Sequence, residues 1–317
     1  MSNDERTILA IDLGKTSCRA RATTRVDGRL KVIAEARGDG APGVADEDGI
    51  AWSVSAIADT IASFDDDVLA LLSGVGVGAA GVEAAPHEVH ELVSRLTEIF
   101  QAPVTVVNDA LAAHAGAFAG GAGTVLIAGT GAVVFDVAAD GVVRQIDGWG
   151  PWLGDEGSGR WIGQQGLEAA LRAVDGRGPA TALAQDAAAV AGGTAALPMW
   201  VGRGGSPARR LGMFAPTVIA RAEQGDAVAV SVVDRACRRL ATSAKAAGTG
   251  SACVVGGLTE HPFFSARLTT AMRSVGVDRV RPLGDALDGA RLIAIDETIT
   301  FGGHVTRSLR SPNLAEA

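Results

Sequence analysis

Four short motifs carry glycines, carboxylates or both, the residue types that bind phosphate groups and move protons. They are "DLGKT" (Asp12–Thr16), "VVND" (Val106–Asp109), "AGTGA" (Ala128–Ala132) and "GWGPWLGDEGSGRWIG" (Gly148–Gly163). The first three come at the ends of short apolar runs that we expect to be buried strands. Glycine turns present backbone N–H groups to phosphate oxygens, and carboxylates can move protons or hold a metal. The motifs therefore point to a small anionic ligand.

The turn at Gly14 is the first candidate phosphate site. It follows a strand and offers backbone N–H groups together with the hydroxyl of Thr16. Asp12, at the end of the strand, is placed to hold a metal ion through water. The spacing of a Walker A loop, G-x-x-x-x-G-K-[ST], is absent. Taken alone, the motif favours a plain turn, because short glycine turns are common.

The second glycine turn occupies the matching place in a repeat. Residues 7–36 and 124–148 share the order strand, glycine turn, strand, Asp-Gly hairpin, strand. We interpret this order as an internal duplication of a βββ unit. Two such turns are stronger evidence than one, because two loops that face each other across a cleft can grip adjacent phosphates. We therefore predict that Gly129, Thr130 and Gly131 bind phosphate together with the first turn.

Asp109 follows Asn108 at the end of a predicted strand, and two roles are open to it. In open α/β sheets the carboxyl ends of strands face the crevice in which ligands bind. There, Asp109 would accept the proton of a hydroxyl that attacks phosphate. The alternative is an N-cap for the helix expected over residues 110–118, a role that aspartate fills well.

The fourth motif holds three of the five tryptophans beside two acids. Its glycines allow a close approach, Trp149 offers a flat apolar face, and Asp155 can accept hydrogen bonds from hydroxyl groups, so the motif suits a sugar. Glu156 precedes a helical pattern and is equally well explained by the preference for acids near helix N-termini. We interpret Trp152 and Trp161 as packing residues.

Composition narrows the class of protein. The 317 residues, 47% hydrophobic, suffice for two domains, and 28 basic against 36 acidic residues give a net charge of −8. Because the charges are interspersed without a basic stripe, we do not expect a nucleic-acid partner. The three cysteines form no C-x-x-C motif, the N-terminus shows no signal-peptide pattern, and no apolar run could span a membrane. We therefore expect a cytoplasmic protein without a membrane partner.

The periodicity predicts an α/β chain that begins with an antiparallel meander. The expected strands are 7–14, 18–24, 30–36, 74–81, 103–109, three within 124–148, and 251–257; the expected helices are 53–72, 87–100, 110–118 and 284–295, with a mainly helical region after residue 156. We place the domain boundary between residues 119 and 123, which gives domains of residues 1–119 and 120–317, with the last residues packing back on the first domain.

In this order the motifs resemble the N-acetylglucosamine kinase branch of the BadF/BadG/BcrA/BcrD-type ATPases, within the sugar kinase, actin and heat-shock chaperone superfamily. The resemblance covers nearly the whole chain and includes "VVGG" and "GDALDGARLIA"; its most specific element is G-W-G-x-x-L-G-D-E-G-S-G. It implies a two-lobed actin-like (ribonuclease H-like) ATPase fold of class α/β, with duplicated βββαβαβα units and a cleft between the lobes.

The resemblance also implies an activity. Family members use ATP with Mg²⁺ and are often homodimers, and this branch phosphorylates an amino sugar, N-acetylglucosamine or glucosamine, at the 6-hydroxyl. Asp109 matches the catalytic base, and Asp12 is the candidate metal residue. The candidate nucleotide-binding residues are Gly14, Lys15, Thr16, Gly129, Thr130, Gly131, Gly256 and Gly257, and the candidate sugar-binding residues are Asn108, Gly148, Trp149, Gly150, Asp155 and Glu156.

Two departures from the family pattern leave the sugar open. Lys15 stands where the first phosphate motif usually has a small residue. The loop of residues 39–49 lacks the asparagine that helps the family to read its sugar. Glucosamine, N-acetylglucosamine or another hexose derivative would fit. The alternatives to a kinase are an activator ATPase, whose dimers hold an iron–sulfur cluster through paired cysteines, and a non-catalytic sugar sensor.

Overall fold

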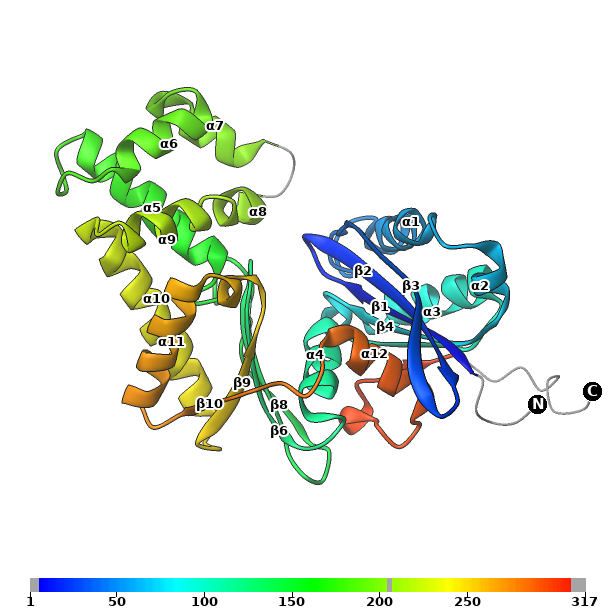
Figure 1. Ribbon diagram of the computed structural model, residues 1–317. Helices are drawn as coiled ribbons and strands as arrows, with labels where there is room; N and C mark the ends of the chain where they lie inside the picture. Colours follow the sequence, from blue (N-terminus) through cyan, green and yellow to red (C-terminus); the bar gives the residue numbers. More distant parts are fainter. Residues whose placement is uncertain (1–5, 204–206, 309–317) are drawn as a thin grey trace, which may run out of the picture. The chain divides into compact units, whose positions relative to one another are not determined.

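The computed structural model describes residues 6–203 and 207–308 (Figure 1). The chain divides into two compact units. Unit 1 consists of the described residues within Met1–Ala122, Val137–Val143 and Pro282–Ala317, and unit 2 of those within Gly123–Asp136 and Arg144–Arg281. Residues 282–308 thus group with unit 1.

Unit 1 contains a six-stranded sheet in the order β11-β5-β4-β1-β2-β3. Its strands are β1 (Thr7–Leu13), β2 (Ser17–Val26), β3 (Arg29–Asp39), β4 (Leu72–Ala79), β5 (Val104–Asn108) and β11 (Thr306–Arg307). The first three form the predicted antiparallel meander, and β4 and β5 run parallel to β1. The carboxyl ends of β1 and β5 therefore lie at the same edge of the sheet, which is where Asp12 and Asp109 stand.

The helices of unit 1 are α1 (Gly49–Ile61), α2 (Asp66–Ala70), α3 (Pro86–Phe100), α4 (Asp109–Phe118) and α12 (Ala286–Ile295), with short 3₁₀ turns at Val82–Ala84 and Phe301–Gly303. The prediction of one helix over residues 53–72 is wrong. The chain turns after Ile61, buries Phe64, and starts α2 with acids in its first turn. Three consecutive aspartates favour a new helix N-terminus over a helix interior. Leu72 already belongs to β4.

Helices α4 and α12 pack backbone to backbone, side by side in Figure 1. A Cβ on Gly116 of α4 would collide with the carbonyl oxygen of Asp285. A Cβ on Gly289 of α12 would collide with the carbonyl oxygen of Ala112. Only glycine permits this approach, and it explains why a segment from the end of the chain joins unit 1.

Unit 2 contains a five-stranded sheet in the order β10-β9-β6-β7-β8. Its strands are β6 (Gly123–Ala128), β7 (Ala132–Val137), β8 (Val143–Asp147), β9 (Ser251–Val255) and β10 (Asp278–Val280); its helices are α5 (Gly159–Val174), α6 (Leu183–Ala191), α7 (Leu197–Gly202), α8 (Pro207–Gly212), α9 (Ala215–Glu223), α10 (Ala227–Ala246) and α11 (Pro262–Ser274), with 3₁₀ turns at Thr194–Ala196 and Gly257–Glu260. Like unit 1, it opens with three consecutive strands, as the predicted duplication requires.

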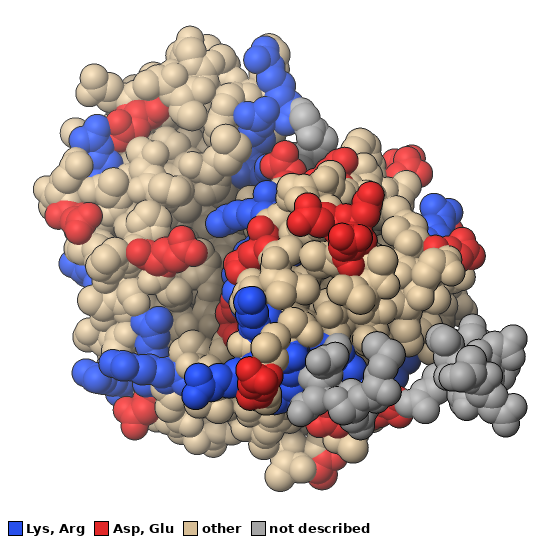
Figure 2. Space-filling view, turned by 45° about the vertical axis from the view of Figure 1, so that its right-hand side comes forward, with Lys and Arg blue, Asp and Glu red and all other residues tan. Residues whose placement is uncertain are grey.

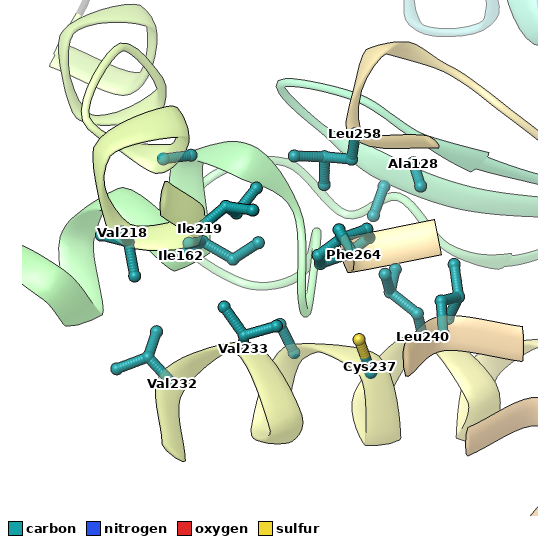
Figure 3. Packing of buried hydrophobic residues seen from close by; sticks show 14 of the residues in the cluster. Ala128, Ile162, Val218, Ile219, Val232, Val233, Cys237, Leu240, Leu258 and Phe264 are labelled. Carbon is teal, nitrogen blue, oxygen red and sulfur yellow. The ribbon is translucent and has the colours of Figure 1, made fainter. Parts of the chain in front are cut away.

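The core of unit 2 lies among its long helices. Figure 3 shows side chains from α5, α9, α10 and α11 pointing toward one another, namely Ile162, Val218, Ile219, Val233, Cys237, Leu240 and Phe264. All are buried, and Phe264 is fully enclosed. This core anchors α5, the helix that follows the fourth motif.

The surface carries charges of both signs. Figure 2 shows acidic and basic side chains on the same face, with uncharged surface between many of them. Within the two described stretches of the chain, no helix has both the length and the apolar character needed to cross a membrane.

Candidate functional site

The first glycine turn joins β1 to β2 in unit 1. The N–H of Gly14 donates to the carbonyl of Ser17 at 3.0 Å, and the carbonyl of Gly14 accepts from Ala41 at 3.3 Å. The amide of Gly14 is therefore engaged within the turn. Lys15 is largely exposed, and its Nζ lies 3.8 Å from a carboxylate oxygen of Asp46. An ion pair that is this exposed contributes about 0–1 kcal/mol, so it leaves Lys15 able to reach a ligand.

Asp12 is held by an arginine of the neighbouring strand. Its Oδ2 accepts hydrogen bonds from Nη2 of Arg19 at 2.7 Å and from Nε of Arg19 at 3.1 Å. Burial raises the pKa of Asp12, and Arg19 opposes that rise. Among residues 6–203 and 207–308, no group of three or more His, Cys, Asp or Glu side chains is arranged to hold a metal ion. Asp12 would thus act as a single carboxylate donor.

The helix cap that the sequence left open belongs to Asn108. Its Oδ1 accepts from the N–H of Ala110 at 2.9 Å, and Asp109 is the first residue of α4. The same N–H also lies 2.9 Å from Oδ1 of Asp109. Because Asn108 caps the helix, the cap does not require the side chain of Asp109. The side-chain carbonyl of Asn108, a candidate sugar contact, is engaged in capping.

The environment of Asp109 makes it a stronger base than an ordinary aspartate. Burial, and then the nearby charge of Asp12, raise the pKa of Asp109 to about 6, against the opposing effects of the Ala110 N–H and Lys15. A base with a pKa of about 6 is still ionised at neutral pH. Unit 1 therefore brings Asp12, Lys15 and Asp109 together.

In unit 2, the second glycine turn is bound to the start of α5. The N–H of Gly159 donates to the carbonyl of Gly129 at 2.8 Å, and the N–H of Arg160 donates to the carbonyl of Thr130 at 3.0 Å. The first N–H groups of a helix have no partner within the helix, and here the loop supplies two acceptors. The turn is further closed by the N–H of Gly129, which donates to Gly131 at 3.0 Å.

A residue that the sequence analysis missed, Asp147, organises the loop of the fourth motif. Its Oδ1 accepts from the N–H of Asp155 at 2.9 Å, and its Oδ2 accepts from the N–H of Glu156 at 2.8 Å. One carboxylate thus closes a loop of eight residues. The signal in the sequence was the Asp-Gly pair after the strand, which also fits an ordinary turn.

Arg160, which the sequence analysis also missed, donates a hydrogen bond to the loop that precedes α5. It is 5% exposed, and its Nη2 donates to the carbonyl of Gly154 at 2.8 Å. Burial lowers the pKa of Arg160, while the charges of Asp155 and Asp147 oppose that change. No motif marks an arginine whose partner is a backbone carbonyl six residues earlier.

Asp155 lies against the second glycine turn. A Cβ on Gly131 would be 3.2 Å from Oδ2 of Asp155 and 3.5 Å from its Cγ. The N-cap of α5 is Ser158, whose Oγ accepts from the N–H of Trp161 at 3.2 Å, so Asp155 does not cap the helix. The carboxylate assigned to a sugar and the turn assigned to phosphate therefore meet in one unit.

The tryptophans of the fourth motif differ in exposure. Trp149 and Trp152 are each 69% exposed, so the interpretation of Trp152 as a packing residue is wrong. Trp161 packs partly against the core of unit 2, as expected.

Glu156 forms an ion pair with Arg239 of α10. The guanidinium of Arg239 also lies 5.5 Å from the ring centroid of Trp161. Besides sugar binding and the preference for acids near a helix N-terminus, Glu156 therefore has a third explanation. Its ion pair with Arg239 connects the loop to α10.

The glycines after β9 lie beside the second glycine turn. A Cβ on Gly256 would be 2.6 Å from the carbonyl oxygen of Ala128, and its φ of 107° suits glycine. Gly257 has no atom of the described residues within 4 Å of the position of a Cβ. The candidate nucleotide-binding glycine Gly256 thus adjoins Ala128, the residue that precedes Gly129.

The chain is similar to known proteins in sequence. The profile of the BadF/BadG/BcrA/BcrD ATPase family matches residues 9–267. The N-acetylmuramic acid/N-acetylglucosamine kinase of Clostridium acetobutylicum is 31% identical over 116 residues, which are 36% of this chain and 37% of that protein. The N-acetyl-D-glucosamine kinase of Dictyostelium discoideum is 32% identical over 141 residues, 44% of each chain. The chain therefore aligns with less than half of the length of these curated relatives.

Solved structures resemble the chain over most of its length. A candidate N-acetylglucosamine kinase from Chromobacterium violaceum gives a TM-score of 0.76 at 27% identity and covers 92% of this chain and 99% of its own. A ROK family glucokinase from Streptomyces griseus, solved with glucose and AMPPNP, gives a TM-score of 0.57 at 20% identity, with coverage of 91% and 99%. These likenesses confirm the predicted two-lobed fold. The family match over residues 9–267 shows that the chain belongs to the BadF/BadG/BcrA/BcrD ATPase family.

Proposed function

We propose that the protein is an ATP-dependent sugar kinase whose acceptor is an amino sugar. The observation that carries the proposal is the position of the Asp155 carboxylate beside the second glycine turn, where its Oδ2 lies 3.2 Å from the place that a Cβ on Gly131 would take. A carboxylate at this place can bind an acceptor hydroxyl beside the turn that binds phosphate. The names of the curated relatives favour N-acetylglucosamine, and the motif resemblance favours its 6-hydroxyl.

In the proposed reaction Asp109 acts as the general base. It accepts the proton of the sugar hydroxyl while the oxygen attacks the γ-phosphorus of ATP and the bond to the β-phosphate oxygen breaks. Asn108 fixes the start of α4 and with it the position of Asp109. Phosphoryl transfer depends mostly on such positioning and on neutralised charge.

The nucleotide would be bound by the glycine turns and by Gly256. Mg²⁺, when bound, neutralises charge on the phosphates. Asp12 is the residue that would hold it through water, because Mg²⁺ usually takes one or two carboxylates together with phosphate oxygens. Arg19 fixes the orientation of that carboxylate through Oδ2.

The activator ATPase is less well supported. All three cysteines are buried, and burial raises the pKa of Cys237 to about 12 and that of Cys253 to about 11. Thiols that share an iron–sulfur cluster between subunits must reach a surface as thiolates.

We also propose that the kinase is a homodimer, as the motif resemblance implies.

The proposal is tested by measuring ADP release with Mg·ATP across glucose, glucosamine, N-acetylglucosamine and N-acetylmannosamine. We expect ADP release to rise at least about tenfold with one amino sugar and a new sugar phosphate signal by phosphorus NMR. ADP release that is independent of every sugar, together with iron in the purified protein, would instead support the activator ATPase.

Asp109→Asn removes the base without changing the size of the side chain. We expect kcat to fall by about 10²–10⁴-fold with AMPPNP affinity unchanged. In the wild type, kcat/KM should fall about tenfold per pH unit below a pH of about 6, because the base must be ionised and its pKa is about 6. A variant that keeps more than about a tenth of the wild-type kcat would refute the assignment of the base.

Asp155→Asn tests the sugar contact, because asparagine tolerates the left-handed backbone of this residue, whose φ is 55°. We expect the KM for the sugar to rise about tenfold or more, since the hydroxyl loses a charged acceptor. The matched control is Ser158→Ala, which removes the cap of α5. It should lower the free energy of unfolding by about 1 kcal/mol and leave the sugar KM unchanged. An unchanged sugar KM in Asp155→Asn would make this loop a structural turn.

A further inference from the structure

Oppositely charged side chains connect β2 to α12 in unit 1. Nη2 of Arg21 lies 3.3 Å from Oδ2 of Asp285, and Nη1 of Arg21 lies 3.5 Å from Oδ1 of Asp288. Arg19, two residues earlier on β2, also reaches Asp285 at 3.5 Å. Each acidic residue of the first turn of α12 thus has an arginine partner on the strand.

One turn further along α12, the alternation of acids on the helix with arginines on the strand ends. At this point the helix carries Arg291 and β2 carries Arg25. Both line a pocket of about 170 Å³ together with Arg6, Thr23 and three aliphatic side chains. No carboxylate is among the described residues that line it. Arginine faces arginine at the position where the pattern of charges calls for an anion.

Arg291 has one unsatisfied donor in this pocket. Its Nε is buried and has no hydrogen-bond partner among the residues that the structure describes. Burial lowers the pKa of Arg291; the charge of Asp288 opposes this change and that of Arg25 adds to it. Buried donors are normally paired, and a guanidinium beside another guanidinium is unfavourable without a counter-ion.

Thr23 and Arg25 each make one hydrogen bond to a backbone carbonyl, and Arg25 has further donor atoms. Oγ1 of Thr23 donates to the carbonyl of Ile8 at 3.5 Å, and Nη1 of Arg25 donates to the carbonyl of Gly28 at 3.0 Å. The other guanidinium nitrogen atoms of Arg25 are chemically able to donate to a ligand. The planar fork of guanidinium matches the oxygens of phosphate, and more than one cation favours a dianion.

We propose that the pocket of Arg6, Thr23, Arg25 and Arg291 binds a phosphate group, either as the free ion or on a small metabolite. It is a separate site from the glycine turns. Ile8, in the pocket, and Gly14, in the first turn, are six residues apart along an extended strand, which corresponds to about 20 Å. The proposal does not depend on the kinase activity.

The test is hydrogen exchange followed by mass spectrometry in the absence of nucleotide, with millimolar inorganic phosphate, with glucosamine 6-phosphate, or with sodium chloride at equal ionic strength. We expect phosphate, and not chloride, to slow exchange at least threefold in peptides of α12 and of the second half of β2. Whichever phosphate compound acts at the lower concentration identifies the source of the group.

Two variants and a control separate this site from the glycine turns. Arg25→Gln should weaken the protection of α12 by about tenfold. Arg25→Glu supplies the missing carboxylate, so α12 should be protected without phosphate and gain nothing from it. Arg95→Gln on α3 removes an exposed arginine that pairs with Glu91 and should behave as the wild type. Equal protection of α12 by phosphate in the wild type and in Arg25→Gln, or protection confined to peptides of the glycine turns, would overturn the proposal.

Discussion

Two hydrogen bonds, from Gly159 and Arg160 at the start of α5 to the carbonyls of Gly129 and Thr130, hold the second glycine turn of unit 2 against that helix. Any helix leaves its first N–H groups without internal partners, and a buried helix start must find them elsewhere. Here the acceptors are the carbonyls of a glycine turn. The turn, the helix and the loop before the helix are therefore one structural element, and Asp155 is carried against Gly131.

In unit 1, the first N–H groups of α4 also need an acceptor outside the helix. Asn108 accepts the hydrogen bond that caps the helix, so the carboxylate of Asp109 is available for chemistry. Burial, and then the charge of Asp12, raise the pKa of Asp109, and Arg19 holds Asp12 in place. Strand β2, which carries Arg19, also carries Arg21, and Arg21 forms an ion pair with Asp285 at the start of α12. The glycine contacts between α4 and α12 then tie this helix to the one that begins with Asp109.

The parts that the sequence predicted well are those determined by local patterns. Short apolar runs, several of which end in glycine, predicted the strands. The two Asp-Gly pairs predicted the hairpins of the antiparallel meanders. The break between α1 and α2 was missed because both segments have helical periodicity, although the buried Phe64 and the three aspartates that follow it separate them. The cap of α4 was ambiguous because asparagine and aspartate cap equally well. Asp147 and Arg160 were missed because their partners are backbone groups. Arg291 was missed because Arg25, the like charge beside it, is distant in the sequence, and no spacing reveals such a contact. Trp152 was misjudged because an indole in a glycine loop can pack or protrude.

The most direct test of the account is calorimetric binding of AMPPNP and of the sugar, measured separately, to Gly131→Val and Gly129→Val. A side chain on Gly131 would press on the carboxylate of Asp155, whereas the nearest atom to a Cβ on Gly129 is 3.9 Å away. The account predicts that Gly131→Val weakens both ligands by about tenfold or more and that Gly129→Val weakens AMPPNP alone. Unchanged sugar affinity in Gly131→Val would contradict the claim that the proposed phosphate turn and the proposed sugar loop form one element.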